Sequence, residues 1–144
     1  MMRFLADVNV WLALTFNLRD DHSAAKNWFE NYAVEGICFC RLTQQAFLRL
    51  ATNPKVMKKD AVTLIEAWAL YDAILKDKRV SFVHEPVDID MQWRSYTQLA
   101  SFSTNVWSDA WLAAFAYTGG YEVVTFDRGF AQYRDLNCTI LVSP

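Results

Sequence analysis

The chain has 144 residues, of which 53% are hydrophobic and 21% charged, with only 4 Gly and 3 Pro. This composition excludes a disordered or fibrous chain and predicts one packed domain over residues 1–144, with a core rich in its 6 Trp, 6 Tyr and 10 Phe side chains. The formal net charge of −2 excludes a positive field around the whole molecule, and taken alone it argues against nucleic acid as a partner.

Hydrophobic periodicity divides the chain into strands and helices that alternate. In chain order, the pattern predicts a strand at 2–6, helices at 9–17 and 21–33, a strand at 36–40, helices at 43–52 and 60–77, a strand at 80–83, helices at 88–101 and 105–118, and strands at 121–126 and 138–142. Thr43, Asp60 and Asp88 are the expected N-caps of their helices. Gly119 and Gly120 are the expected stop of the last helix.

The predicted strands are continuously apolar, which is typical of strands that are buried on both faces. Such strands, alternating with helices, predict a parallel sheet between two layers of helices, a three-layer α/β fold. No apolar run reaches the roughly 18–20 residues of a membrane span. The 3 Cys form no C-x-x-C pair. We therefore expect a soluble, cytoplasmic protein without membrane contact, disulfides or a zinc site.

Several common catalytic motifs are missing from the sequence. The 4 Gly form neither G-x-G-x-x-G nor a P-loop, and no serine lies in a G-x-S-x-G elbow. These absences exclude the standard nucleotide-cofactor and acyl-transfer sites. Asp88 and Asp90 resemble a D-x-D metal motif, but the position of Asp88 at a helix start favours a capping role.

Three other aspartates occupy positions where a carboxylate is costly. Asp7 and Asp127 each follow an apolar strand, so both should lie at the carboxyl edge of a parallel sheet, where α/β folds bind ligands. Asp109 falls on the apolar stripe of the 105–118 helix and should point inward. Each has a structural alternative: Asp7 could cap the next helix, Asp127 could start a turn, and Asp109 could pair with an arginine.

A divalent cation would satisfy three carboxylates that converge without matching basic residues. Mg²⁺ and Mn²⁺ prefer carboxylate oxygens and keep several waters for a substrate and a nucleophile. We therefore take Asp7, Asp109 and Asp127 as candidate catalytic residues at a site for Mg²⁺ or Mn²⁺.

Four segments around these aspartates are LADVNVWLAL at 5–14, CRLTQQAFLRLATNP at 40–54, NVWSDAWLAAFA at 105–116 and VVTFDRGF at 123–130. In this order and spacing they resemble a PIN domain, and specifically the ribonuclease toxin of VapBC-type toxin–antitoxin pairs. The resemblance implies a five-stranded parallel sheet of order 3-2-1-4-5, cleavage of tRNA or another structured RNA with Mg²⁺ or Mn²⁺, a homodimer and a cognate antitoxin. Candidates for the dimer interface, if exposed, are Trp68, Tyr71, Trp93 and Tyr96.

The resemblance also assigns roles to individual residues. Asp7 matches the metal ligand after the first strand, Asp109 the aspartate of the late helix, and Asp127 the aspartate after the fourth strand. Asn9 and Thr125 match polar positions beside the first and last of these.

One position departs from the family pattern. Many PIN domains have Glu after the Thr of the 43–52 helix, where this chain has Gln44, which shares an apolar stripe and should point inward. Gln45, one step round the helix, is the second choice for that position. Because an amide adds no negative charge, the site should hold its cations less tightly.

The predicted reaction is hydrolysis, in which a cation held by Asp7 and Asp109, with Asp127 directly or through water, activates a water that attacks phosphorus in line. Basic side chains that could grip the RNA backbone are Arg41, Lys55, Lys58, Lys59 and Arg128. Two alternatives remain open: a catalytically weakened PIN-like module that binds RNA or protein, and a DNA nuclease of the same fold.

Overall fold

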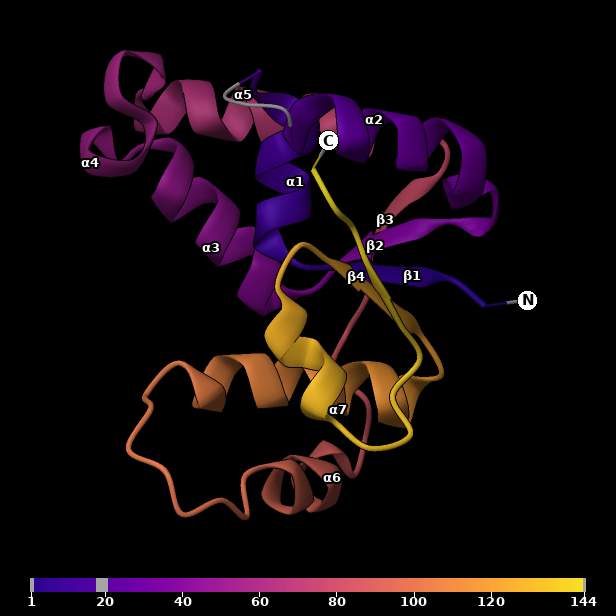
Figure 1. Ribbon diagram of the computed structural model, residues 1–144. Helices are drawn as coiled ribbons and strands as arrows, with labels where there is room; N and C mark the ends of the chain where they lie inside the picture. Colours follow the sequence, from indigo (N-terminus) through magenta and orange to yellow (C-terminus); the bar gives the residue numbers. More distant parts are fainter. Residues whose placement is uncertain (1, 18–20, 144) are drawn as a thin grey trace.

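The computed structural model describes residues 2–17 and 21–143. Its centre is a parallel sheet in the order β3-β2-β1-β4-β5 (Figure 1). The predicted parallel sheet and its strand order are confirmed. The strands are β1 (Phe4–Ala6), β2 (Ile37–Phe39), β3 (Val80–Phe82), β4 (Glu122–Thr125) and β5 (Cys138–Ile140).

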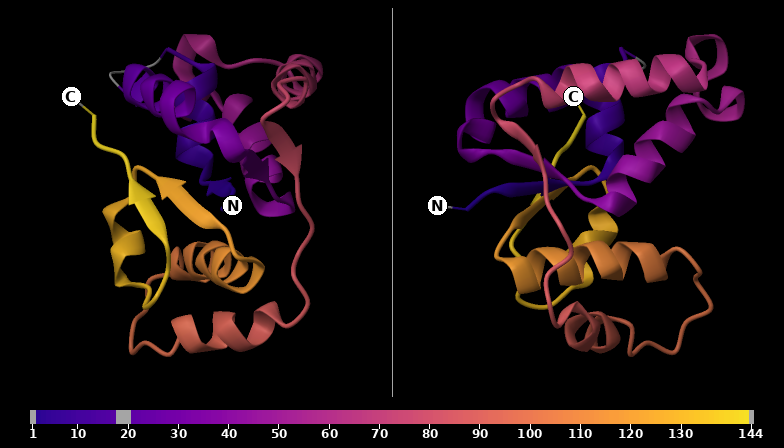
Figure 2. Two further views of the ribbon diagram at one scale, coloured as in Figure 1. Left: turned by 90° about the vertical axis from the view of Figure 1, so that its right-hand side faces the viewer. Right: turned by 180° about the vertical axis from the view of Figure 1, so that it is seen from behind.

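Helices cover both faces of the sheet, which gives the expected three layers (Figures 1 and 2). The upper layer in Figure 1 contains α1 (Val8–Thr15), α2 (Asp21–Tyr32), η1 (Ala33–Glu35), α3 (Arg41–Ala51), α4 (Pro54–Met57), η2 (Lys58–Asp60) and α5 (Leu64–Leu75). The lower layer contains α6 (Ile89–Tyr96), α7 (Val106–Gly119) and the short η3 (Arg128–Gln132).

Neighbouring residues of each strand enter different cores, because successive side chains of a strand point to opposite faces. Leu5 and Cys38 pack with α7, whereas Ala6 and Phe39 pack with α1. Both faces of the sheet are therefore buried, and this is why the strands show no alternation of polar and apolar residues.

An aromatic cluster joins β2 to the upper helices. The ring of Phe39, which is fully buried, stacks on Trp11 with their centroids 3.8 Å apart and their planes 9° apart. Phe47 and Tyr71 meet the same ring edge-on, at centroid distances of 6.1 and 4.9 Å. One side chain of the sheet thus holds α1, α3 and α5 in place.

The start of α3 differs from the prediction. The helix begins at Arg41 with Cys40 as its N-cap, whereas Thr43 was expected there. Thr43 instead lies in the first turn, and its hydroxyl accepts a hydrogen bond from the Cys40 amide at 3.0 Å. The side chain satisfies a free amide at the helix start, as predicted, but from three residues further along.

The predicted cap Asp60 is also wrong, whereas Asp88 does occupy the N-cap position of α6, as predicted. Thr63 caps α5, and its hydroxyl accepts a hydrogen bond from the Glu66 amide at 3.2 Å. In the opposite direction, the Thr63 amide donates to Glu66 Oε1. Asp60 lies in η2, before this capping box. Asp88 precedes α6 in a left-handed conformation, at φ 69°, and its side chain makes no capping bond. Thr63 and Glu66 match the T-x-x-E signature of a capping box, which the apolar periodicity alone did not reveal.

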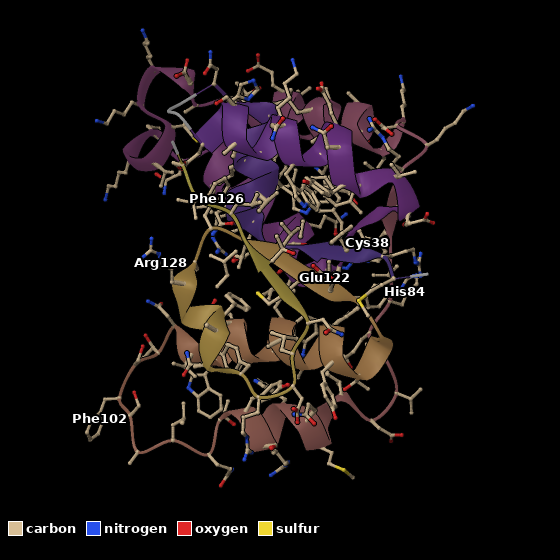
Figure 3. The ribbon with its side chains drawn as sticks, turned by 45° about the vertical axis from the view of Figure 1, so that its right-hand side comes forward. Cys38, His84, Phe102, Glu122, Phe126 and Arg128 are labelled. Carbon is tan, nitrogen blue, oxygen red and sulfur yellow. The ribbon has the colours of Figure 1, made fainter. Side chains whose placement is uncertain are left out.

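The helix predicted at 88–101 ends at Tyr96. The Thr97 hydroxyl donates to the Trp93 carbonyl at 2.9 Å, and residues 98–103 are not helical. Phe102 projects from this segment into solvent (Figure 3). By contrast, α7 ends as expected, because Gly120 adopts the left-handed conformation (φ 77°) that a helix stop favours.

Two of the four aromatics considered for a dimer interface are not available to a partner. Tyr71 and Tyr96 are buried, with exposed fractions of 3% and 6%. Trp93 is partly buried against the α7 core. Trp68 on α5 is half exposed, so it alone of the four retains a large free surface.

The cysteines carry no cross-links, as predicted. All three thiols are free, and Cys38 and Cys40 are buried. Burial raises the pKa of both thiols, which keeps them protonated and unreactive. Within the described ranges 2–17 and 21–143, none of the helices is long and apolar enough to cross a lipid bilayer.

The Phe39 cluster generates a stability prediction. Phe39→Ala should lower the free energy of unfolding by about 3–5 kcal/mol, because it leaves a cavity among three aromatic rings. Urea unfolding followed by circular dichroism measures this loss. Trp68→Ala, which truncates a half-exposed ring, is the control and should change the free energy much less. Equal losses in the two variants would contradict the assigned core.

Candidate active site

The sheet brings two of the predicted acids together at the carboxyl ends of its central strands. β1 and β4 are neighbours, with Ala6 opposite Val124. The Asp7 amide continues this ladder by donating to the Val124 carbonyl at 2.9 Å. Asp7 therefore lies beside Thr125, and Asp127 follows two residues later on the same edge.

Both carboxylate oxygens of Asp7 are fixed by short hydrogen bonds. The Val8 amide donates to Oδ1 at 2.8 Å, and the Thr125 hydroxyl donates to Oδ2 at 2.8 Å. Asp7 is thus the N-cap of α1, as the capping alternative predicted. It is at the same time a member of the acid cluster. Burial raises the pKa of Asp7, and the Asp127 charge raises it further, while the two hydrogen bonds oppose the rise.

Asn9 and Thr125, the two polar positions expected beside the acids, link the two strand ends. The Asn9 Nδ2 group donates to the Thr125 hydroxyl at 3.3 Å and to Asp7 Oδ2 at 3.5 Å. On its other side, Asn9 Oδ1 accepts from the Phe126 amide at 3.2 Å, and the Thr125 hydroxyl accepts from the Asp127 amide at 3.0 Å. These bonds hold the end of β4 against the start of α1.

Asp127 is held by the turn that follows β4. Its Oδ1 accepts from the Gly129 amide at 2.8 Å, which makes Asp127 the N-cap of η3. A Cβ at Gly129 would lie only 3.1 Å from Asp127 Oδ1, so a side chain there would push against the carboxylate. The turn alternative therefore also holds, and the glycine is needed for this close approach.

Asp109 has no such support. It is half buried on α7, and among the described residues no lysine or arginine forms an ion pair with it. Burial raises the pKa of Asp109 to about 6, with further contributions from the charges of Asp7 and then Asp127. The arginine alternative is wrong for Asp109. The three acids are close enough to repel one another, and no basic side chain offsets the repulsion.

Tyr133 is a neighbour of the acids that the sequence pattern did not indicate. Burial raises its pKa to about 12, with additional contributions from the Asp109 and Asp127 charges. Its hydroxyl is buried and has no hydrogen-bond partner among the described residues. Tyr133 follows η3 in a region without a recognisable motif, so only the folded arrangement brings it to the acids.

Gln44 points inward, as predicted, and its partners are Arg41 and Tyr71. It is 8% exposed, and its Oε1 accepts a hydrogen bond from Arg41 Nη1. Burial raises the pKa of Tyr71, and a hydrogen bond with Gln44 partly opposes that rise. No bond between Gln44 and Asp7 is present in the described part of the chain. Gln45, the second choice, is exposed on the next position of α3.

The remaining candidate residues lie at the surface. Arg128 follows Asp127 and extends outward from η3 (Figure 3). Lys55, Lys58 and Lys59 are exposed on α4 and η2. Asp88 and Asp90 lie at the start of α6, in the opposite helical layer from these lysines, and both are exposed.

The acid cluster has the donor chemistry for a divalent cation but is not a closed cage. Among the described residues, no set of three or more Asp, Glu, His or Cys side chains is arranged to hold a metal ion. Mg²⁺, however, needs only one or two carboxylates, because it retains several waters. Coupled carboxylates that lack a basic partner, such as Asp7 and Asp109, fit this requirement.

Comparison with known proteins gives a consistent result. The profile of the PIN domain matches residues 4–136. Ribonuclease VapC41 of Mycobacterium tuberculosis is 42% identical over 142 residues, covering 95% of this chain and 97% of the relative.

Solved structures extend the likeness to the fold. VapBC2 from Rickettsia felis, bound to a DNA fragment from its promoter, has a TM-score of 0.72 at 15% identity and covers 98% of this chain and 100% of that one. VapC20 of Mycobacterium tuberculosis, a toxin that cleaves the sarcin-ricin loop, has a TM-score of 0.62 at 18% identity, with 93% and 98% covered. At these identities the structures support the fold.

The raised pKa of Asp109 generates a pH prediction. Between its ordinary value of 3.8 and about 6, the folded state binds more protons than the unfolded state, so stability falls as pH rises and stays low above about pH 6. Asp109→Asn removes this charge. In metal-free buffer, its melting temperature should therefore exceed that of the wild type by a margin that grows from pH 3.8 to about pH 6 and stays constant above that.

Thermal melts at several pH values in EDTA measure this margin. Asp90→Asn is the matched control, because it removes an exposed carboxylate from α6 and should melt like the wild type at each pH. A constant difference between Asp109→Asn and the wild type across the range would contradict the electrostatic account.

Proposed function

This chain belongs to the PIN-domain family, and within it to the VapC-type ribonuclease toxins, and from that premise we propose that Asp7, Asp109 and Asp127 are the residues with which it hydrolyses RNA. Its activity is that of an endoribonuclease, which cuts phosphodiester bonds within RNA. The observation that carries the assignment is electrostatic: in addition to burial, the charges of Asp7 and Asp127 raise the pKa of Asp109, and the charge of Asp127 raises the pKa of Asp7. No basic side chain among the described residues pairs with these acids. Proteins retain such destabilising clusters at functional sites.

We propose a divalent cation, Mg²⁺ or Mn²⁺, as the cofactor that this cluster binds. Ribonucleases of this type generally depend on a divalent metal. Asp7 and Asp109 would hold the cation, with Asp127 assisting. When bound, the cation supplies an activated water and offsets the charge that develops on the phosphate.

The protein's own part in the reaction is to position the carboxylates. The Val8 amide and the Thr125 hydroxyl each bind one oxygen of Asp7, so its orientation is set before substrate arrives. The Gly129 amide does the same for Asp127. Because these groups are oriented in advance, the transition state does not have to bear the entropy loss of ordering them.

We also propose the partners of this enzyme. RNA is the substrate, and we expect tRNA or another structured RNA in particular. An RNA substrate together with free cysteines favours the cytoplasm as the location. A cognate antitoxin is supported by neighbours that were solved as VapBC complexes. A homodimer remains part of the proposal. Residues 1–144 would act as one PIN domain.

A second candidate function is supported by Gln44. Gln44 stands where many PIN domains have Glu, so the site has one carboxylate fewer, and the Gln44 Oε1 atom is already bonded to Arg41. A site weakened in this way would bind RNA or protein without cutting it. The cleavage experiment below separates the two functions, and DNA substrates in the same assay test the DNA nuclease alternative.

The first functional prediction concerns Asp7. Asp7→Asn should reduce cleavage of a tRNA mixture in Mg²⁺ or Mn²⁺ to background, because it removes a central charge of the cluster. Thr125→Val should lower the rate by about 10–100-fold, the usual cost of losing a partner that orients a metal ligand. Gel analysis of 5′-labelled RNA measures both rates.

The matched control is Asp90→Asn, which should cleave at the wild-type rate. EDTA should stop the reaction, and excess Mg²⁺ should restore it. Equal cleavage by wild type and Asp7→Asn would overturn the assigned site. A wild type that binds RNA but never cuts it would support the weakened module, and cleavage of single- or double-stranded DNA alone would support a DNA nuclease.

The second functional prediction concerns Gln44. Gln44→Glu adds a buried carboxylate and should lower the Mg²⁺ concentration for half-maximal cleavage several-fold. Gln45→Glu adds the same charge at an exposed position one residue away and should leave that concentration unchanged. Equal effects of the two substitutions would show that Gln44 does not face the metal site.

A further inference from the structure

An aromatic cleft lies at the same sheet edge, on the β3 side of the acids. It is a cavity of about 560 Å³ between the start of α3, the segment that follows β3, and α7. The right-hand view of Figure 2 shows the chain after β3 crossing from the upper to the lower layer beside α7. The side chains that define the cleft here are Arg41, Phe82, His84, Trp93, Trp107 and Trp111.

The rings of this cleft are held in position and yet are open to solvent. The Trp93 Nε1 group donates to the Trp107 carbonyl at 3.0 Å, and the two indoles meet edge-on with centroids 6.1 Å apart. Trp107 keeps 59% of its surface exposed. Below it, Trp111 packs against the buried Phe115. A flat ligand can therefore stack without first ordering the rings.

Arg41 places a cation beside these rings. Its guanidinium lies 4.8 Å from the centroid of the Phe82 ring and donates from Nη1 to Gln44 Oε1. A guanidinium has five N–H donors, and the side chain is exposed, so further donors can reach a phosphate. The buried Gln44 thus orients a residue that faces the cleft.

The cleft and the acid cluster share helix α7. Trp107 and Ser108 line it, and Asp109 is the next residue of α7. Figure 3 shows Arg128 on one side of the molecule and His84 on the other, with the central strands between them. A strand of RNA along this edge would pass Arg128, the acids and then the cleft.

We propose that this cleft binds an unpaired nucleotide of the RNA, next to the phosphodiester that is cut. The base stacks on the Trp107 and Trp111 indoles, and Arg41 binds its phosphate. Unpaired bases that stack on aromatic rings, beside a basic group for the backbone, are the usual mode of single-stranded RNA recognition. This inference rests on the proposed function, since the RNA must reach the acids to place a neighbour here.

The test uses Asp7→Asn as the parent, so that RNA is bound without being cut. The probe is a fluorescently labelled octaribonucleotide of randomised sequence, titrated by fluorescence anisotropy beside an abasic version and a blunt RNA duplex. Trp107→Ala should raise the Kd for the octaribonucleotide about tenfold, the effect of losing one base stack, with much less change for the abasic probe. Trp107→Phe should restore most of the affinity.

Trp68→Ala is the matched control, because Trp68 is also about half exposed, at 50%, but lies on α5 away from the cleft. It should bind like the parent. Arg41→Gln should weaken the normal and abasic probes equally and reduce the salt dependence by about one phosphate contact. Thermal melts confirm that each variant is folded.

Several outcomes would overturn the subsite. One is equal affinity of Trp107→Ala and Trp68→Ala for the octaribonucleotide. Another is a parent that binds the duplex more tightly than the octaribonucleotide. A parent that is dimeric by light scattering, with a monomeric Trp107→Ala, would assign the cleft to a second copy of this chain.

The failure of the subsite can be told apart from failure of the proposed function. If the wild type cuts RNA and Asp7→Asn does not, while Trp107→Ala binds normally, the subsite alone is wrong. If no variant cuts RNA but Trp107→Ala loses base-dependent binding, the cleft stands and the nuclease proposal fails.

Discussion

Repulsion between three carboxylates is the constraint around which this site is built. Asp7, Asp109 and Asp127 come from β1, α7 and the end of β4, and only rigid elements can hold like charges together. The pairing of β1 with β4 provides that rigidity, and the Thr125 hydroxyl and two backbone amides bind the carboxylate oxygens directly. The aromatic core around Phe39 compensates for the stability that this edge of the sheet loses.

At the same edge, an acid cluster that suits cations lies near basic and aromatic groups that we propose bind RNA. The net charge of the chain does not indicate this arrangement. A formal charge of −2 argued against nucleic acid, yet part of the excess negative charge is gathered in one cluster that suits cations. On one flank of the cluster lies Arg128, and on the other lie Arg41 and the tryptophans of the cleft. The local arrangement of charges, and not their sum, therefore governs which ligand approaches the protein.

Much of the fold could be predicted from the sequence, because buried parallel strands are continuously apolar and a glycine pair marks the end of α7. Asp7, Asp109 and Asp127 stood out because a carboxylate is unusual in apolar surroundings. Helix starts were less predictable from apolar periodicity: the pattern indicated Asp60, whereas the capping box of Thr63 and Glu66 sets the start of α5.

The cleft and Tyr133 could not be predicted, because their neighbours are brought together only by the fold. Gln44 shows the same limit, since its inward direction was predictable but its bond with Arg41 was not.

The central place of β1 determines when this enzyme becomes active during its own synthesis. Asp7 leaves the ribosome first, but its partner Thr125 lies 118 residues later in the chain, and Asp127 later still. A chain that emerges from its N-terminus can complete neither the central pair of strands nor the acid cluster until β4 has been translated and released. The proposed catalytic edge therefore forms only after β4 is made, and an unfinished chain lacks the acid cluster that we propose cuts RNA.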